Sequence, residues 1–287
     1  MPKVSIIIRS FNDIGYIGRV FDMIKTQTFT NYEIISVDSG STDGTYEEIK
    51  RRHPAVHYQI RPDEYVPGKV LNTAVAKGTG DIIVFNNSDC IPQNNRWLEN
   101  LINPILHDER IAAVFCRQAP RPNASNLVRF DHARAFGDGS ISSKWHHFFS
   151  LASSAIPKRY LEMWPFRSDL KYSEDIEWSF RMRGRGYKIE YRKDAVVEHS
   201  HNYTAQELFR RFRGEGGADA KIFGDGSKKK FFSYVLRPYL GSIARDLGCL
   251  TAKGLPNIWL IESLKNRYIQ NYARYVGYNE EVEESGL

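Results

Sequence analysis

The amino-acid sequence predicts an α/β protein with a Rossmann-like, mostly parallel central sheet flanked by helices and a C-terminal helical region. Two observations favour this fold class. Between residues 4 and 116, short apolar runs alternate with segments of helical periodicity, which is typical of βαβ units with right-handed crossovers. The run Ile82–Phe85 is unbroken and rich in β-branched residues, as in a strand buried on both faces of a parallel sheet.

Each apolar run in this first part defines one expected strand. The expected strands are Val4–Ile8, Tyr32–Val37, His57–Ile60, Ile82–Phe85 and Ile111–Cys116. The helices expected between them cover Ile14–Gln27, a segment from Thr42 or Asp43 to about Arg52, Lys69–Ala76 and Arg96–His107. In the first helix apolar side chains recur every three or four residues, so one face is predicted to pack on the sheet.

The second half of the chain has a different composition. Gln118–Ser143 is predicted to be a long loop with a short helix near Val128–Ala135, and Trp145–Ile156 is expected to return to the sheet. A helix over Ser173–Gly184, strands over Tyr187–Tyr191 and Ala195–Val197, and a basic helix from about Ala205 to Arg213 follow. Gly214–Gly217 is expected to interrupt this helix, after which the chain is mainly helical to its end.

The chain is accordingly divided into a domain of residues 1–217 and a C-terminal helical region of residues 218–287. In this region the apolar side chains fall on one helical stripe, formed by Ile258, Ile261, Leu264, Tyr268, Tyr272 and Val276. We expect the stripe to pack on the first domain or on a second subunit. A tyrosine-rich, basic amphipathic helix is alternatively suited to resting on a membrane surface.

Composition bounds the class of protein. The chain has 287 residues, of which 41% are hydrophobic and 26% charged, as in ordinary globular domains, and its formal net charge of +6 suits an anionic ligand or surface. Its three cysteines show no metal-ligand spacing, which indicates a reducing compartment. Neither a signal-peptide pattern nor an apolar run long enough to span a bilayer occurs, so we expect a cytoplasmic protein that touches a membrane only from its inner face.

Polar loops follow three successive strands, at residues 9–13, 38–45 and 86–92. Because parallel strands end at one edge of their sheet, these loops are expected to form one binding crevice. The candidate binding residues in them are Arg9, Ser10, Phe11, Asn12, Asp38, Ser39, Asn87, Ser88 and Asp89. We interpret Asp89 as holding a divalent cation, Mg²⁺ or Mn²⁺, on a nucleotide diphosphate; the alternative is a turn residue or helix N-cap.

Particular roles in this chemistry can be suggested for individual residues. Asp38 could accept a hydrogen bond from a pyrimidine N–H, unless it serves only an Asx turn. Lys69 could neutralise phosphate, or simply be solvated. Glu174 and Asp175 begin a helix, where one can cap or bind while the other acts as a base. Arg117, Gln118 and Arg121 follow the fifth strand and could contact phosphate or acceptor.

Two histidines, His199 and His201, lie two residues apart, so in an extended segment they share one face. One of them could ligate a metal while the other assists, or both could line the site. The alternative for each is an ordinary core or surface histidine.

Taken together, these segments resemble the family 2 glycosyltransferases of the GT-A fold, most closely a bacterial rhamnosyltransferase-like branch, over about residues 3–217. The motifs that carry the resemblance are V-S-I-I-I-R-S-F-N-D at 4–13, D-S-G-S-T-D-G-T at 38–45, G-K-V-L-N-T-A at 68–74, N-S-D-C-I-P at 87–92, F-C-R-Q at 115–118, S-E-D-I-E-W at 173–178 and V-E-H-S-H-N-Y-T at 197–204. Their order and spacing, rather than any single motif, make the resemblance specific.

The resemblance implies a role for each matching residue. Asp38 would contact the base, Asp89 would be the last residue of the metal-binding D-x-D element, Asp175 would be the catalytic base, and His199 would complete the metal site. Asn87 departs from the family pattern, where an aspartate or glutamine is frequent, so the metal site has one carboxylate fewer.

The expected activity is that of a metal-dependent inverting glycosyltransferase. It would move a sugar from a nucleotide-sugar donor, dTDP-L-rhamnose, to a hydroxyl of a saccharide or lipid-linked saccharide acceptor in bacterial surface polysaccharide synthesis. A UDP-hexose is the alternative donor. Two other classes are disfavoured. A nucleic-acid-binding protein is disfavoured because the basic residues are dispersed and no recognition motif occurs. A sugar nucleotidyltransferase needs a glycine-rich, basic loop after the first strand, and residues 9–13 contain no glycine. We expect no nucleic-acid partner; a homo-oligomer is compatible with the sequence.

Overall fold

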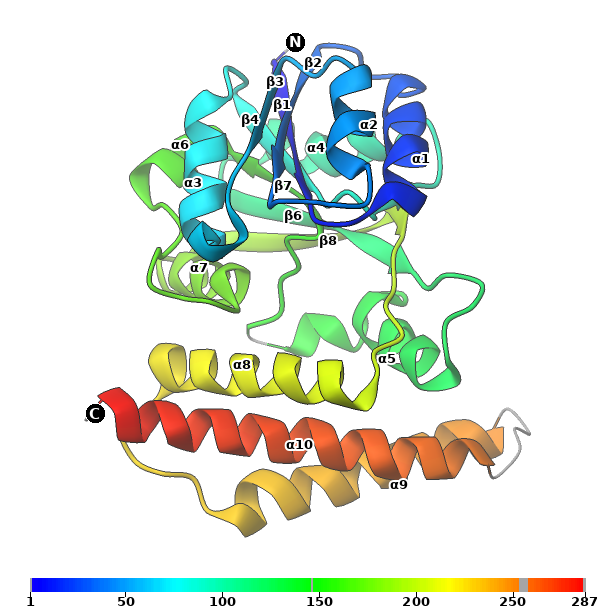
Figure 1. The fold of residues 1–287 in the computed structure, drawn as a ribbon, viewed down its shortest axis with the longest axis vertical. Helices are drawn as coiled ribbons and strands as arrows, with labels where there is room; N and C mark the ends of the chain where they lie inside the picture. Colours follow the sequence, from blue (N-terminus) through cyan, green and yellow to red (C-terminus); the bar gives the residue numbers. More distant parts are fainter. Residues whose placement is uncertain (1, 146, 253–257, 286–287) are drawn as a thin grey trace. The chain divides into compact units, whose positions relative to one another are not determined.

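The computed structural model describes residues 2–145, 147–252 and 258–285 (Figure 1). The chain forms two compact units. The sheet unit contains residues 1–121, 134–170 and 174–200, and the helical unit contains residues 122–133, 171–173 and 201–287. Both units are therefore built from segments that are not contiguous in the sequence.

The sheet unit is organised around one sheet, which in the described residues has eight strands in the order β3-β2-β1-β4-β7-β6-β8-β5. The strands are β1 (Val4–Ser10), β2 (Tyr32–Asp38), β3 (Val56–Gln59), β4 (Ile82–Asn86), β5 (Ile91–Pro92), β6 (Ile111–Ala119), β7 (Ser153–Pro157) and β8 (Lys188–Glu198). Strands β1 to β4 pair in parallel, as do β6 and β8, while β7 runs antiparallel to β4 and β6. The mostly parallel sheet predicted from the sequence is confirmed.

Helices cover both faces of this sheet (Figure 1). The helices of the sheet unit are α1 (Ile14–Lys25), α2 (Thr45–Arg51), α3 (Pro67–Lys77), α4 (Trp97–His107), α6 (Lys158–Met163) and α7 (Glu174–Gly184), with short 3-10 turns at Pro62–Glu64 and Ser142–Lys144. Side chains of α1, α2 and α4 pack on one face and those of α3, α6 and α7 on the other. Consecutive β1 residues alternate between the two cores, as the strand period of two requires.

The strand register brings the polar loops to one edge. Ser10 lies opposite Asp38 in the β1–β2 pair, and Ile7 lies opposite Phe85 in the β1–β4 pair. The carboxyl ends of β1, β2 and β4 thus lie side by side, as predicted. The N–H of Ser88 donates to the carbonyl of Arg9 at 3.0 Å, which continues the alignment into the loop after β4.

Several elements differ from the sequence expectation. Strand β6 continues to Ala119 because its polar end pairs with β8, and β8 is one strand rather than two. The pair Ile91–Pro92 forms β5 against Val197 and Glu198, a contact that no local pattern indicates. Helix α5 (Asn126–Phe136) extends the predicted helix near Val128–Ala135 by one or two residues at each end, whereas the six-residue helix α6 was missed.

The helical unit consists mainly of α8 (Ala205–Phe223), the π-helical turn η3 (Phe232–Leu236), α9 (Arg237–Ala252) and α10 (Ile258–Ser285). The expected interruption at Gly214–Gly217 is wrong: α8 runs through it without a break. These glycines permit close packing instead, since a Cβ on Gly216 would lie 2.1 Å from the carbonyl oxygen of Arg274 in α10. Reciprocally, a Cβ on Gly277 would lie 1.9 Å from the carbonyl oxygen of Arg213.

The predicted domain boundary at residue 217 falls inside α8. The division of the chain into two domains at this residue stays a prediction. None of the helices in the described ranges is long and apolar enough to cross a bilayer.

Candidate active site

The loops after β1 and β2 hold each other through their polar side chains. Asn12 adopts the left-handed region with φ of 56°, which asparagine tolerates better than most residues. Its N–H donates to the Ser41 hydroxyl at 2.8 Å, and its side-chain oxygen accepts from the N–H of Thr42 at 2.9 Å. Asn12 therefore joins two of the three loops that were expected to form the site.

Asp38 is buried at the end of β2 and is saturated with donors from the chain. The donors are the N–H groups of Gly40 and Ser41, the hydroxyls of Ser10 and Ser41 and the amide of Gln59, at 2.6–3.0 Å. Although burial acts in the opposite direction, these hydrogen bonds, led by the Ser41 hydroxyl, hold the pKa of Asp38 below its ordinary value. A carboxylate has about four acceptor sites, so a base N–H could bind Asp38 only by displacing one of these donors.

Arg9 connects the loop after β4 with the start of α7. Its guanidinium donates to the side-chain oxygen of Asn87 and to a carboxylate oxygen of Glu174, each at 3.2 Å. Ser88 donates its hydroxyl to Asp13, the residue that precedes α1. Burial raises the pKa of Asp13, and the nearby Asp89 carboxylate adds to the effect. All three loops and the first turn of α7 thus belong to one hydrogen-bonded cluster.

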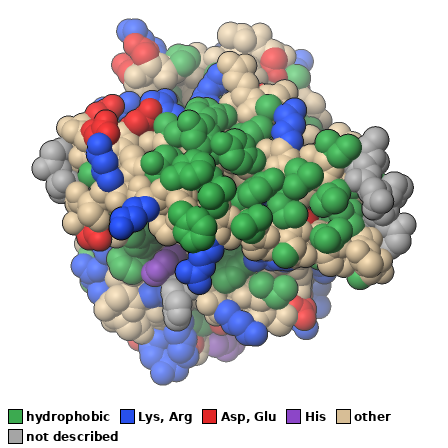
Figure 2. All heavy atoms as spheres, turned by 90° about the horizontal axis from the view of Figure 1, so that it is seen from below, with side chains coloured by type: hydrophobic (Ala, Val, Ile, Leu, Met, Phe, Trp, Pro, Cys, Tyr) green, Lys and Arg blue, Asp and Glu red, His purple; other side chains and the backbone are tan. Residues whose placement is uncertain are grey.

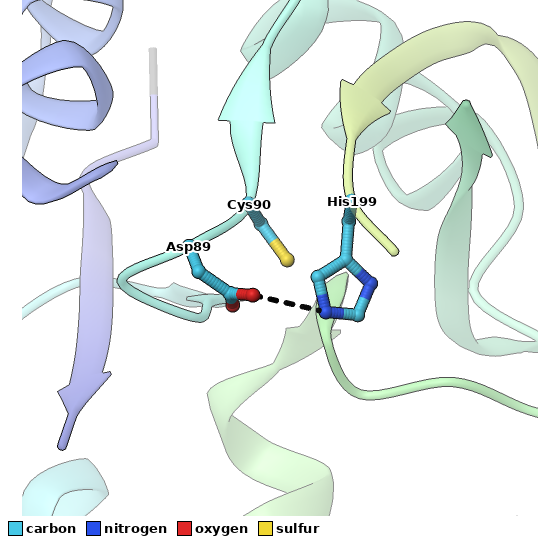
Figure 3. Close-up of side chains that lie close together, drawn as sticks. All are labelled: Asp89, Cys90 and His199. Atoms are coloured by element: carbon cyan, nitrogen blue, oxygen red, sulfur yellow. Dashed lines mark ion pairs between the residues drawn. The ribbon is translucent and has the colours of Figure 1, made fainter. Parts of the chain in front are cut away.

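Asp89 and His199 point toward each other from β4–β5 and from the end of β8 (Figure 3). Asp89 is 5% exposed, and its carboxylate lies 3.4 Å from Nε2 of His199. Nδ1 of His199 donates to the side-chain oxygen of Gln118 at 2.8 Å, and the Gln118 amide donates to the Ser150 hydroxyl. This bond directs the other imidazole nitrogen, Nε2, at the Asp89 carboxylate, as in metal sites where an outer partner orients a histidine ligand.

Arg121 is the second partner of Asp89. It is buried and donates to both the backbone carbonyl and the carboxylate of Asp89, at 2.7 and 3.1 Å. Its guanidinium lies 4.0 Å from the centre of the Tyr16 ring, and it also donates to the carbonyl of Ser200. Arg121 therefore balances the charge of Asp89 and fixes its position.

The carboxylate of Asp89 and the imidazole of His199 are suitable ligands for a hard divalent cation, which would need further ligands to complete its coordination. Asp89, Cys90 and His199 place one ligand atom each within 4.8 Å of one another (Figure 3). Burial, helped by the Asp89 charge, raises the pKa of the Cys90 thiol well above its ordinary value, so the sulfur stays protonated. A neutral thiol is not a ligand for Mg²⁺ or Mn²⁺, whereas a carboxylate and an oriented imidazole are suitable.

Glu174 and Asp175 have different environments although they are adjacent at the start of α7. The Glu174 carboxylate is paired with Arg9. Asp175 accepts hydrogen bonds from the N–H groups of Leu151 at 3.2 Å and Ile176 at 2.8 Å. Burial and the Glu174 charge nevertheless raise the pKa of Asp175 to about 7. At neutral pH Asp175 is the carboxylate that can take up a proton, as a general base must.

The remaining predicted site residues have varied surroundings. Lys69 in α3 and Arg117 in β6 are exposed, and Phe11 is 55% exposed at the tip of the first loop. Ser39 is buried, and its N–H donates to the carbonyl of Ser10. His201 belongs to the helical unit, where its ring stacks on Tyr203.

Three residues that were not predicted to position the site do so in the structure. Gln118 orients His199, Arg121 holds Asp89, and Ser41 binds Asp38 and Asn12. Gln118 and Arg121 were noted only as possible acceptor or phosphate contacts. Their roles depend on the pairing of β6 with β8, which brings Gln118 opposite Val197 and which the sequence does not reveal.

Comparison with known proteins identifies the family of the chain. Residues 5–162 match the model of the family described as glycosyl transferase family 2. The O-antigen chain rhamnosyltransferase RfbN of Salmonella typhimurium is 33% identical over 227 residues, which cover 75% of this chain and 71% of RfbN. The O-antigen chain rhamnosyltransferase WbaN of Salmonella anatum is 31% identical over 230 residues, covering 75% and 72% of the two chains.

Among solved structures, the mannosyltransferase PcManGT from Pyrobaculum calidifontis, in complex with GDP-Man and Mn²⁺, superposes with a TM-score of 0.67. It is 22% identical, and the match covers 99% of this chain and 88% of that one. At this identity the likeness shows the fold, which is the GT-A fold expected from the sequence.

The fold and the matches define the class: the protein is a glycosyltransferase. The chain belongs to glycosyl transferase family 2, with relatives among the rhamnosyltransferases of O-antigen synthesis.

Proposed function

We propose that the protein is an inverting glycosyltransferase that moves rhamnose from dTDP-L-rhamnose to a hydroxyl of a growing bacterial surface glycan. The observation that carries the proposal is Asp175, a carboxylate with a pKa raised to about 7 at the same edge of the sheet as the donor-binding loops. The donor is suggested by the two O-antigen rhamnosyltransferases that the chain resembles over three quarters of its length.

Asp175 acts as the general base on the acceptor. Its ionised carboxylate takes the proton of the attacking hydroxyl, whose oxygen displaces the nucleoside diphosphate at C1 and inverts that carbon. Leu151 and Ile176 hold the carboxylate in place through their N–H groups. Arg9 neutralises Glu174, so the repulsion between the two adjacent carboxylates is reduced when Asp175 is ionised.

Asp89 and His199 would hold the divalent cation, with His201 as a further predicted ligand. When bound, such a cation stabilises negative charge on the departing diphosphate. The structural relative PcManGT was solved with Mn²⁺, which supports this assignment. Arg121, already bonded to Asp89, keeps the carboxylate oriented for it.

The loops after β1 and β2 would bind the nucleoside. Arg9, Ser10, Phe11 and Asn12 lie along the first loop, and Phe11 offers an exposed ring on which a base can stack. Asp38 would contribute to nucleoside binding by positioning the hydroxyls of Ser10 and Ser41, because its own acceptor sites are occupied. Lys69 and Arg117 are exposed cations available to phosphate.

A donor panel tests this assignment directly. Thermal unfolding is measured with dTDP-L-rhamnose, UDP-glucose and GDP-mannose, each with and without Mn²⁺, because a ligand that binds the native state raises its apparent stability. The largest rise is expected for dTDP-L-rhamnose with Mn²⁺. A larger rise for the UDP-hexose would replace the proposed donor with the alternative one.

Stereochemistry tests the mechanism separately. With an acceptor that supports turnover, the anomeric configuration of the new bond is determined by NMR. Inversion is expected, since a single base serves a single displacement. Retention of configuration would contradict the role given to Asp175.

A further inference from the structure

The helical unit exposes a continuous set of large apolar side chains. They lie on η3, α9 and α10 and comprise Phe231, Phe232, Leu240, Leu247, Ile261, Leu264, Tyr268 and Tyr272, here called the outer apolar surface. Phe232 and Ile261 are 68% and 67% exposed, and Leu240 is 61% exposed. Figure 2 shows hydrophobic side chains gathered on this face, with lysines and arginines around them.

Helix geometry places the α10 side chains of this surface on one stripe. Along α10, Ile261, Leu264, Tyr268 and Tyr272 are spaced by three and four residues, so they form one stripe. These four positions belong to the stripe that the sequence predicted to pack on the first domain or on a second subunit, with a membrane surface as the alternative, and in the single chain they are exposed. Farther along α10, Tyr278 and Val282 are buried with Ala220 of α8. Helix α10 is therefore covered by its own unit near its C-terminal end, whereas the stripe between residues 261 and 272 is open.

The margin of the outer apolar surface is positively charged. Lys230 precedes Phe231, Arg237 lies one turn before Leu240, and Lys265 follows Leu264. All three are exposed, and none forms an ion pair within the described residues. Of the acidic residues in the same elements, Asp246 is buried in an ion pair with Arg267 and Glu262 is half-buried. The other four, Glu280, Glu281, Glu283 and the exposed Glu284, lie at the C-terminal end of α10.

The acidic end of α10 does not offset this charge. Glu280, Glu281 and Glu283 are each paired with a basic residue of the helical unit, namely Arg213, Lys221 and Lys228. A rim with three unpaired cations therefore surrounds a tyrosine-containing apolar face. Tyrosine is favoured where a side chain meets both apolar and aqueous surroundings, as Tyr268 and Tyr272 do here.

We propose that the outer apolar surface binds the surface of a lipid bilayer that contains anionic lipid, with α9 and α10 lying in the plane of the interface. Apolar side chains enter the boundary between headgroups and acyl chains, and Lys230, Arg237 and Lys265 contact anionic headgroups. A second copy of the chain fits this face less well, because a symmetric contact would bring two positive rims together. The proposal does not depend on the proposed donor or mechanism.

Vesicle flotation of the full chain tests the proposal. One set of vesicles contains phosphatidylcholine alone, and the other also contains phosphatidylglycerol. We expect binding to the anionic set that weakens as salt is raised. Replacing Phe232 and Ile261 together by serine should reduce binding about a hundredfold, since each buries a large apolar side chain. Lys230→Gln with Lys265→Gln should reduce binding to anionic vesicles about fivefold for each residue and leave binding to neutral vesicles unchanged.

A matched control separates this surface from apolar exposure in general. Leu106 in α4 is 46% exposed in the sheet unit, and Leu106→Ser should leave vesicle binding unchanged. Thermal unfolding of each variant establishes that it is folded, and all of these positions are on the surface. The absence of binding to anionic vesicles at low salt would overturn the proposal. If the protein then forms a concentration-dependent dimer that the Phe232→Ser, Ile261→Ser variant dissociates, the outer apolar surface binds a second copy of the chain instead.

Discussion

Asp175 illustrates how two adjacent carboxylates acquire different properties. Glu174 is neutralised by Arg9, while burial beside Glu174 raises the pKa of Asp175 to about 7. For a general base the rate rises as the carboxylate ionises, so the proposed activity should rise with pH through an apparent pKa near 7. The positive charge of Arg9 lowers the pKa of Asp175, so Arg9→Met should shift the rise in activity to higher pH. The measurement is the pH dependence of kcat/KM for both proteins.

Replacing Asp175 by asparagine should separate catalysis from stability. Turnover should fall about 10²–10⁴-fold, the range that a positioned base contributes, while nucleotide binding stays nearly intact. Because the folded-state pKa of Asp175 is raised, ionisation disfavours folding as pH rises from about 4 to 7. Asp175→Asn should therefore unfold at a higher temperature than the original protein at pH 8, with a difference that disappears near pH 4. Near-normal turnover would contradict the base assignment.

The residues proposed to bind the metal lead to a further prediction. Asp89→Ala should remove the Mn²⁺ dependence of nucleoside diphosphate binding, measured by calorimetry. Gln118→Leu should weaken the Mn²⁺-dependent binding about 10–100-fold, because His199 loses the partner that fixes its orientation. Binding without metal serves as the reference for both variants. Equal affinities with and without Mn²⁺ in the original protein would rule out the assigned roles.

At the residue level, sequence patterns predicted the acidic and histidine positions better than their partners. Asp38, Asp89, Asp175 and His199 stand out because each follows an apolar run or begins a helix. Their partners do not: Gln118 and Arg121 reach His199 and Asp89 only through a pairing of strands distant in the sequence. Whether Asp38 had a free acceptor site was also undecidable, because Ser10 and Gln59 reach it from other strands.

At the level of elements, glycines in α8 and α10 set how closely the two helices pack. Gly216→Ala should destabilise the protein by about 1–3 kcal/mol, since the new methyl would overlap the Arg274 carbonyl. Gly248 in α9 is the matched control, because a Cβ there meets no atom within 4 Å. Gly248→Ala should stabilise by about 0.5–1 kcal/mol through helix propensity. Denaturant unfolding measures both; equal effects would show that the close contact is not decisive.

The same glycines explain why α8 was predicted too short. A glycine cluster usually ends a helix, and only the position of α10 shows that these residues serve close packing. Long, strongly periodic elements such as α1 and α4 were predicted to within about two residues, as was the buried strand β4. The two-residue β5 and the short α6 depend on tertiary pairing and carry no comparable signal.

At the level of the whole chain, the helical unit is discontinuous in sequence. Residues 122–133 lie between β6 and β7 along the chain but belong to the helical unit. Arg267 of α10 ties this segment in: it is buried and pairs with Asp131 at 2.8 Å and with Asp246 at 2.7 Å. Such connections between distant segments cannot be inferred from local periodicity, which is why a single boundary at residue 217 was predicted.

This organisation predicts the result of cutting the chain at that boundary. A truncated chain of residues 1–217 would retain Asp131 without Arg267, end in the middle of α8, and lose the α10 backbone against which Gly216 packs. We expect it to be insoluble or to unfold without a cooperative transition. In the full chain, Arg267→Met should lower the free energy of unfolding by about 3–5 kcal/mol, because Asp246 would remain buried without its cationic partner. If the 1–217 chain is instead soluble, unfolds cooperatively and binds nucleotide, residues 1–217 form an independent domain and the ion pairs of Arg267 are dispensable for folding.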